Sequence, residues 1–460
     1  MKIVTGICLV LCLFTSAPLH AQSMAGDWKG LLKVENVGLE MRINIHIQQD
    51  GEALSGKIDL LDQGVNDMKM DKLTFQDSKF SFMLGGAATY LGTLDANGKL
   101  EGKLEQAGQK LPLDFVRGIW VINRPQEPKA PFPYSITEVS YPNAAAEGVT
   151  LSATLTVPDG LENYPAVVLI SGSGPSDRNE GIMMHQPFWV IADYLSRHGI
   201  AVLRFDDRGV GKSTGKHAMA TSADFASDAL AGVAYLKGRS DLHIGKIGFL
   251  GHSEGGTIGP MAATKSSDIG FVVMLAGTGV RGDILLARQT ELVELANGKS
   301  PEEAKKEGMN GAEIFSLIVK SKSIKDAKKK VERFIDHAAK TDTSITPADT
   351  RALLAQLNNV WMRYFLAYDP APTLAKVKCP VLAINGDKDI QVPADMNLPA
   401  IDAALKKGGN PDFKIQQFPG LNHLFQHCTT CSVAEYGRLE ETISPEVLQV
   451  VGDWILLHAK

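Results

Sequence analysis

The chain has 460 residues, a formal net charge of −5 and 22% charged residues. This balance gives no reason to expect nucleic acid or an anionic membrane surface as a partner. The length suggests two or three domains, and the sequence does not exclude a homo-oligomer.

The first residues are typical of a secretory signal peptide. One basic residue, Lys2, precedes an apolar run over residues 3–14, and small residues lead to Ala21. The run is too short to anchor the chain in a membrane, and no other long apolar segment follows it. We therefore expect cleavage after residue 21, export to the periplasm or the extracellular medium, and no integral membrane segment.

Residues 24–117 predict a small antiparallel β-domain. Apolar and polar residues alternate over residues 41–48, which is the period of a half-buried strand. Hairpin turn signals separate further alternating segments, so we expect a barrel or sandwich of about eight strands. Trp28 is expected in its core or at its rim. The polar faces and the lack of a catalytic constellation indicate an accessory or assembly module, followed by a proline-rich linker over residues 118–135.

Residues 136–460 alternate strand and helix patterns, which indicates a mostly parallel sheet with helices on both faces. Helices are expected over residues 189–198, 223–237 and 445–458. A charged helical insertion over about residues 281–370 predicts a lid above the catalytic edge of the sheet. Within it, residues 346–349 resemble a capping box that opens a helix.

The pentapeptide Gly251-His252-Ser253-Glu254-Gly255 lies between a predicted strand and a predicted helix of small residues. A serine on such a turn projects its hydroxyl from the end of the sheet, as the nucleophile of a hydrolase does. The pentapeptide alone is a weak signal, and its flanking strand and helix strengthen it. We predict that Ser253 is the nucleophile.

A serine nucleophile needs a base and an orienting carboxylate, which follow it along the chain in this kind of fold. A predicted strand ends beside Asp387 and Asp389, and both are candidates for the carboxylate. The stretch from Gly386 to Asp389 resembles the Gly-x-x-Asp pattern of α/β-hydrolases, and this resemblance favours Asp389, with Asp387 shaping the turn. His423 follows the next predicted strand and is favoured as the base over His427 and His458. Because the base must be neutral, activity is expected to fall below about pH 6.5, the value of a free histidine.

The oxyanion of an acyl-transfer intermediate needs two backbone N–H donors. The residue after the nucleophile, Glu254, supplies one. The second is expected in the glycine-rich loop after the predicted strand at residues 165–170, where we favour Ser173, with Gly172 and Gly174 as alternatives.

Aromatic residues of the predicted lid are candidates for the substrate pocket. Trp361 and Phe365 are expected to line it, or else to hold the lid against the body of the domain. Arg363 lies between them, and it either binds a substrate carboxylate or forms a surface ion pair.

Two other motifs carry weaker signals. Residues 208–214 resemble the end of a phosphate-binding loop, but Asp206 stands where the first glycine belongs and would repel phosphate. Cys428 and Cys431 form either a disulfide or two free thiols, and no second cysteine pair stands at zinc-ligand spacing. We therefore expect no nucleotide, metal or organic cofactor.

Together, the motifs over residues 171–178, 205–213, 251–256 and 422–426 resemble those of α/β-hydrolases. More narrowly, they resemble a group of exported bacterial carboxylesterases related to the serine aminopeptidase branch, some of which carry an N-terminal β-rich domain. The resemblance implies esterase activity on small acyl esters through a Ser-His-Asp triad. A peptidase with the same triad, using Glu254 as an anchor, and a glycan- or envelope-binding protein with a vestigial hydrolase domain are the alternatives.

Overall fold

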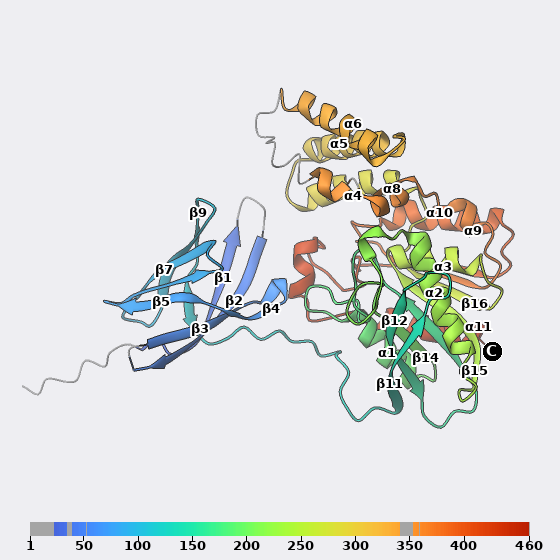
Figure 1. Ribbon diagram of the computed structural model, residues 1–460, viewed down its shortest axis with the longest axis horizontal. Helices are drawn as coiled ribbons and strands as arrows, with labels where there is room; N and C mark the ends of the chain where they lie inside the picture. Colours follow the sequence, from blue (N-terminus) through green and yellow to red (C-terminus); the bar gives the residue numbers. More distant parts are fainter. Residues whose placement is uncertain (1–22, 35–38, 52, 341–352, 358, 460) are drawn as a thin grey trace, which may run out of the picture. The chain divides into compact units, whose positions relative to one another are not determined.

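The computed structural model describes residues 23–34, 39–51, 53–340, 353–357 and 359–459. The predicted signal peptide and the predicted helix start at residues 346–349 lie outside the described residues. The described residues form two compact units (Figure 1), of which the first extends to Trp120 and the second begins at Val121.

The first unit is an antiparallel β-sheet. In the described part of the chain it has ten strands: β1 (Gly26–Val34), β2 (Leu39–Asp50), β3 (Ala53–Leu60), β4 (Val65–Lys69), β5 (Asp71–Gln76), β6 (Lys79–Leu84), β7 (Ala88–Leu94), β8 (Leu100–Gln106), β9 (Gln109–Pro112) and β10 (Phe115–Arg117). Their order is β4-β3-β2-β1-β10-β8-β7-β6-β5, with β9 paired to β8. Because β5 returns to contact β3, the sheet nearly closes into a barrel. The expected eight strands become ten because strands as short as β9 and β10 show no alternation in the sequence.

The interior of this sheet is a single apolar cluster. Ile43, Ile45 and Ile47 on β2 are at most 3% exposed, as predicted, but Asn44 between them is also buried, so the alternation is interrupted there. Trp28 is 1% exposed, and its indole N–H donates to the carbonyl oxygen of Met24 at 2.9 Å. Trp28 is therefore a core residue, and this unit is stabilised mainly by apolar burial.

Residues of the predicted linker form hydrogen bonds within both units. The Asn44 side chain accepts from the Trp120 amide at 2.7 Å and donates to the Trp120 carbonyl oxygen at 3.0 Å, inside the first unit. Within the second unit, the Arg124 guanidinium donates to the carbonyl oxygens of Gly437 at 2.8 Å and Leu439 at 2.7 Å. Residues on both sides of position 121 thus belong to a folded unit.

The second unit is built on an eight-stranded sheet in the order β11-β12-β14-β13-β15-β16-β17-β18. Its strands are β11 (Tyr134–Pro142), β12 (Thr150–Pro158), β13 (Tyr164–Ile170), β14 (Ala201–Phe205), β15 (Ile244–His252), β16 (Ile269–Leu275), β17 (Val381–Gly386) and β18 (Phe413–Phe418). Strand β12 is antiparallel to both of its neighbours, and the pairs from β14 to β18 are parallel. This topology confirms the predicted α/β-hydrolase fold.

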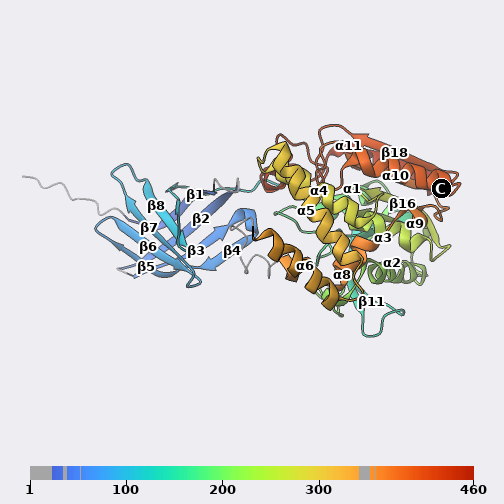
Figure 2. The ribbon, with the colours of Figure 1, turned by 90° about the horizontal axis from the view of Figure 1, so that it is seen from above.

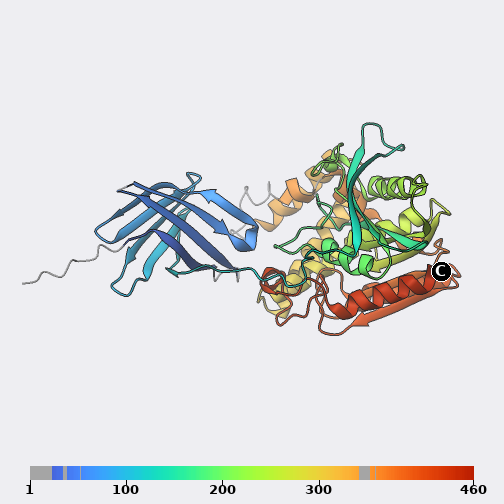
Figure 3. The same ribbon diagram turned by 90° about the horizontal axis from the view of Figure 1, so that it is seen from below.

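Helices cover both faces of this sheet and bury two apolar clusters. On one face lie α2 (Ser222–Lys237), α3 (Glu254–Ala263), α9 (Ala371–Leu374) and α10 (Ala394–Lys407). On the other lie α1 (Pro187–Arg197) and α11 (Pro445–His458), the latter drawn in red in Figure 3. The helices predicted near residues 189–198, 223–237 and 445–458 are confirmed as α1, α2 and α11. No helix among the described residues has the length and apolar character to cross a bilayer.

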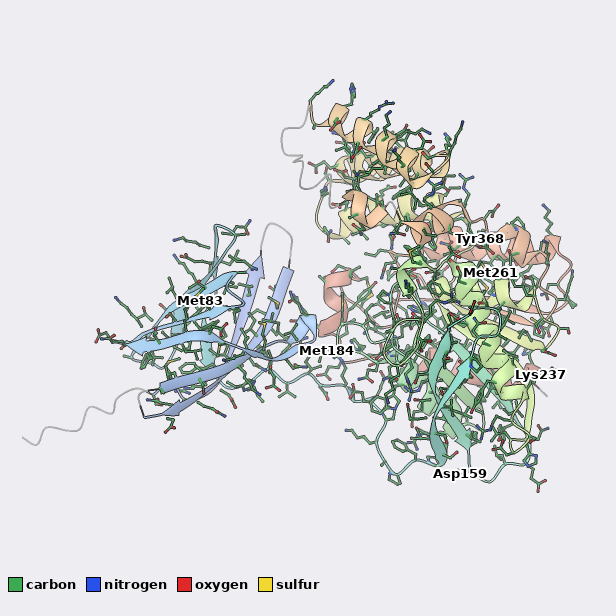
Figure 4. The ribbon with its side chains drawn as sticks, in the orientation of Figure 1. Met83, Asp159, Met184, Lys237, Met261 and Tyr368 are labelled. Carbon is green, nitrogen blue, oxygen red and sulfur yellow. A yellow bond between two sulfur atoms is a disulfide. The ribbon has the colours of Figure 1, made fainter. Side chains whose placement is uncertain are left out.

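A helical insertion separates β16 from β17. It contains α4 (Gly282–Ala296), α5 (Pro301–Val319), α6 (Ile324–Ala338) and α8 (Val360–Ala367), which lie together in Figure 2 and share an apolar cluster of their own. The end of α8 packs on the body of the unit: the Tyr364 hydroxyl lies 4.0 Å from the Met261 sulfur of α3, and Figure 4 labels Met261 and the nearby Tyr368.

Candidate active site

Ser253 occupies a strained turn between β15 and α3. Its φ of 55° and ψ of −118° lie in a region that a non-glycine residue adopts only at a cost. Two glycines make the turn possible: a Cβ on Gly251 would lie 2.0 Å from the carbonyl oxygen of Gly255, and one on Gly255 would lie 2.0 Å from that of Ile170. The Ser253 amide donates to the Leu275 carbonyl oxygen at 2.8 Å, which fixes the turn against β16.

Asp389 and His423 meet at the same edge of the sheet. The Nδ1 atom of His423, in the loop after β18, lies 2.8 Å from Oδ2 of Asp389, in the loop after β17. The other Asp389 oxygen accepts the amides of Gln391 and Val392, each at 2.8 Å. Both side chains are almost fully buried. With Nδ1–H donating to the carboxylate, Nε2 of His423 is left to accept a proton.

The alternative residues lie elsewhere. Asp387 accepts the Gly420 amide at 2.6 Å, which fits the turn-shaping role expected for it. His427 binds Glu441 at 2.9 Å with a mostly exposed side chain, and His458 stacks on Trp454 at 4.2 Å between ring centroids. The structure therefore brings together the favoured pair, Asp389 and His423.

A cavity of about 820 Å³ lies between the edge of the sheet that carries Ser253 and His423 and the helical insertion, which we call the lid. Ser253, Glu254 and His423 line it from the edge of the sheet, and Trp361 and Phe365 line it from α8. Most of the other lid residues that face it are apolar, namely Leu285, Leu286, Ile314, Phe315, Leu353, Leu357 and Met362. The cavity is large and apolar enough to bury a small organic substrate.

The loop after β13 contains the amides predicted to bind an oxyanion. The Gly172 amide donates to Oε1 of Glu180 at 2.6 Å and is occupied. The Ser173 amide donates to no group in the part of the chain that the structure describes, and Ser173 lines the cavity with Gly174. The Glu254 amide stands at the N-terminus of α3, where helix amides favour negative charge. The geometry therefore keeps Ser173 and Gly174 as candidates and excludes Gly172.

Asp207 holds both ends of this loop, a function that the sequence did not suggest. Its Oδ1 accepts the Ser171 hydroxyl at 2.9 Å and its Oδ2 accepts the Ser176 amide at 2.9 Å. Burial raises the pKa of Asp207 to about 7. The neighbouring Asp206 binds Arg178 at 2.8 Å, so the stretch that resembles a phosphate-binding loop supports the loop that contains Ser173.

Glu254 is buried, follows Ser253 directly in the chain, and binds the lid. Its carboxylate accepts the Ser222 hydroxyl at 2.6 Å and the Trp361 indole N–H at 2.9 Å, and burial raises its pKa. Trp361 also stacks on Phe365 with ring centroids 5.3 Å apart. Trp361 thus lines the cavity and also holds α8 against α3, while Phe365 lines the cavity; that the pair contacts a substrate stays a prediction.

Two further expectations have definite outcomes. Arg363 donates to the carbonyl oxygens of Ile318 at 3.0 Å and Ser321 at 2.8 Å, so it caps the end of α5 and both expected roles for it are wrong. Cys428 and Cys431 form a disulfide. Among the described residues, no group of three or more His, Cys, Asp or Glu side chains is placed to hold a metal ion.

Known proteins resemble parts of this chain. The family model for the X-Pro dipeptidyl-peptidases of family S15 matches residues 147–398, which is more than half of the chain and includes Ser253 and Asp389. Esterase EstD of Thermotoga maritima is 30% identical over 278 residues, which cover 60% of this chain and 58% of EstD. The chain thus spans less than two thirds of EstD.

Two more known proteins resemble this chain over a similar share of its length. An uncharacterized 31.7 kDa protein of Escherichia coli is 24% identical over 68% of this chain and 97% of its own length. The solved structure of the Pyrococcus furiosus esterase Pf2001 covers 71% of this chain and 94% of its own, with 16% identity and a TM-score of 0.43. The chain belongs to the S15 peptidase family and, with the sheet topology described above, to the α/β-hydrolase superfamily.

Proposed function

We propose that this chain is an exported serine carboxylesterase that hydrolyses small acyl esters. The observation that supports it most directly is the 2.8 Å bond from Asp389 to His423, which lines the same cavity as Ser253. Export is consistent with the predicted signal peptide and with the Cys428–Cys431 disulfide, since such bonds persist in oxidising compartments.

In the proposed reaction, the Ser253 hydroxyl oxygen attacks the ester carbonyl carbon while Nε2 of His423 takes the hydroxyl proton. The oxyanion accepts hydrogen bonds from the amides of Glu254 and Ser173. His423 then gives the proton to the departing alcohol oxygen, which leaves an acyl group on Ser253. Water attacks this acyl group while His423 takes a proton from it. His423 then returns that proton to the Ser253 oxygen as the bond to the acyl carbon breaks and the carboxylic acid departs. Asp389 holds the imidazole and stabilises its charged form, and no cofactor takes part.

A peptidase is the second candidate, and two observations favour it. The family match is to X-Pro dipeptidyl-peptidases, and the buried Glu254 carboxylate lies in the cavity next to the nucleophile. A carboxylate there suits an ammonium group on the substrate. The lid, however, presents mostly apolar side chains to the cavity, which favours a small ester with an apolar acyl group.

The test compares wild-type protein with Ser253→Ala and with Ser267→Ala, a change at an exposed serine after α3. We expect a fluorophosphonate probe to label the wild type and Ser267→Ala only. Ester turnover, followed with p-nitrophenyl butyrate, should fall on the order of 10⁴- to 10⁶-fold in Ser253→Ala. An unlabelled wild type contradicts the proposal. Faster cleavage of alanyl-prolyl p-nitroanilide than of the ester identifies a peptidase instead.

A further inference from the structure

Glu180 and His252 connect three loops of the candidate site. Oε1 of Glu180 accepts the Gly172 amide at 2.6 Å and lies 3.0 Å from Nδ1 of His252. Nε2 of His252 lies 3.0 Å from the carbonyl oxygen of His423. A continuous chain of hydrogen bonds therefore runs from the loop after β13, through the last residue of β15, to the loop after β18.

Each end of this chain adjoins a group of the proposed reaction. Gly172 precedes Ser173, the proposed oxyanion donor, and His252 precedes the nucleophile Ser253. The third contact is the backbone of the proposed base, His423. Glu180, His252 and His423 are 7%, 7% and 5% exposed, so water competes little for these bonds.

The hydrogen-bond partners indicate how the protons are placed. A carbonyl oxygen only accepts, so Nε2 of His252 carries a proton toward His423. Glu180 already accepts an amide, and a carboxylate accepts a second donor readily, which places the other proton on Nδ1. Burial lowers the pKa of His252, but the Glu180 charge and hydrogen bond oppose this effect and the net pKa is raised. The Asp389 charge also raises the pKa of His252. The ring centroids of His252 and His423 lie 4.8 Å apart.

Glu180 itself is held in a costly state. Its φ is 51°, in the left-handed region, and its Oε2 atom is buried without a hydrogen-bond partner in the described part of the chain. Strained residues and unpaired buried polar atoms persist where the surrounding structure imposes them, and they cluster at functional sites. The carboxylate is therefore kept at this position in spite of its cost.

We propose that Glu180 and His252 are positioning residues that fix the oxyanion loop, the nucleophile and the base relative to one another. This proposal rests on the proposed serine hydrolase function, since it assigns the pair a role in that reaction. The pair does not touch the reacting atoms. It acts through the Gly172 amide, the Ser253 backbone and the His423 carbonyl oxygen, and an error of about 1 Å among such groups costs on the order of 100-fold in rate.

The test is Glu180→Gln, which keeps the size of the side chain and an oxygen for the Gly172 amide but removes the charge that favours a protonated His252. We expect kcat for p-nitrophenyl butyrate to fall about 10- to 100-fold while KM changes less than about 3-fold. In nuclear magnetic resonance titrations of ¹³C-histidine-labelled protein, the His252 ring should lose its proton at lower pH in the variant. Glu441→Gln is the control, because Glu441 forms a carboxylate–histidine pair with the exposed His427.

The two proposals fail differently. A labelled, active wild type with an equally active Glu180→Gln overturns the positioning role and leaves the esterase proposal intact. An inactive, unlabelled wild type overturns both. If Glu180→Gln does not fold, His252→Gln, which retains a donor toward the His423 carbonyl oxygen, should show the same fall in kcat, and its full activity likewise overturns the positioning role.

Discussion

The two units of this protein differ in what they bury. Among the described residues, the first unit buries one uncharged polar side chain, Asn44, within an otherwise apolar core. The second unit buries many polar and charged side chains, and several of them, including Asp207, His252 and Asp389, lie at or just after the carboxyl ends of sheet strands. Burying such groups costs free energy unless they are paired. The comparison indicates that the first unit is stabilised by a nearly all-apolar core. The second unit gives up some of its free energy of unfolding to hold polar groups at the candidate site.

The largest effect should come from the buried carboxylate at the base. Asp389→Asn replaces the acceptor of the His423 Nδ1–H and favours the wrong tautomer, so we expect kcat to fall on the order of 10⁴-fold with little change in fold. Ester turnover and circular dichroism measure the two properties. Asp387→Asn, which alters the nearby turn, should lower kcat less than about 3-fold, which corresponds to no more than the free energy of one lost hydrogen bond. A greater loss in Asp387→Asn than in Asp389→Asn would contradict the assignment.

An apolar change in the first unit should affect stability alone. Ile45 is fully buried on β2, so Ile45→Ala leaves a cavity and should lower the local free energy of unfolding by about 2 to 5 kcal/mol. Hydrogen exchange of peptides from β2 measures this quantity. Ester kcat should stay at the wild-type value at temperatures where the unit is folded. A fall in kcat under those conditions would show that the first unit contributes to the chemistry.

A smaller effect should appear in the pH dependence of stability. Burial raises the pKa of Asp207 to about 7, so its carboxyl is neutral in the folded protein at pH 5 and ionised at pH 8. The unfolded chain, with a pKa of about 3.9, is ionised at both values, so the buried charge destabilises the folded state as pH rises through 7. Relative to Asp207→Asn, the wild type should lose about 1 to 3 kcal/mol of unfolding free energy between pH 5 and pH 8.

Urea titrations at the two pH values measure this difference. Asp402→Asn, a change on the surface of α10 at a carboxylate paired with Lys406, is the control and should show no such dependence. Equal changes with pH in the wild type and in Asp207→Asn would mean that the Asp207 carboxyl does not titrate near pH 7 in the folded protein.

Local patterns were enough to predict much of the second unit. The strand, the glycines and the small-residue helix around Ser253 predict the turn, because only that succession brings the backbones as close as Gly251 and Gly255 require. The order of the chain predicts that Asp389 and His423 meet, because loops after parallel strands lie at one edge of a sheet. The catalytic roles of these residues are predictions that the proposed experiments test.

Other features depend on contacts that local sequence does not carry. Trp361 and Glu254 are 107 positions apart, and their bond exists because the lid folds back over α3. Arg363 reaches carbonyl oxygens at the end of α5, where the sequence indicates only a charged residue between aromatics. The bond between Glu180 and His252 depends on the left-handed backbone of Glu180 in its loop. The sequence motif of this loop shows its glycines, but it does not show where the Glu180 side chain points.

The most direct test of the account is to trap the acyl group that it places on Ser253. Wild-type protein mixed with p-nitrophenyl acetate is quenched in acid within the first turnovers, digested and analysed by peptide mass spectrometry. The account predicts one acetyl group on the peptide that contains Ser253, absent in Ser253→Ala. Turnover that continues in Ser253→Ala, or an acetyl group found only on another residue, would contradict it.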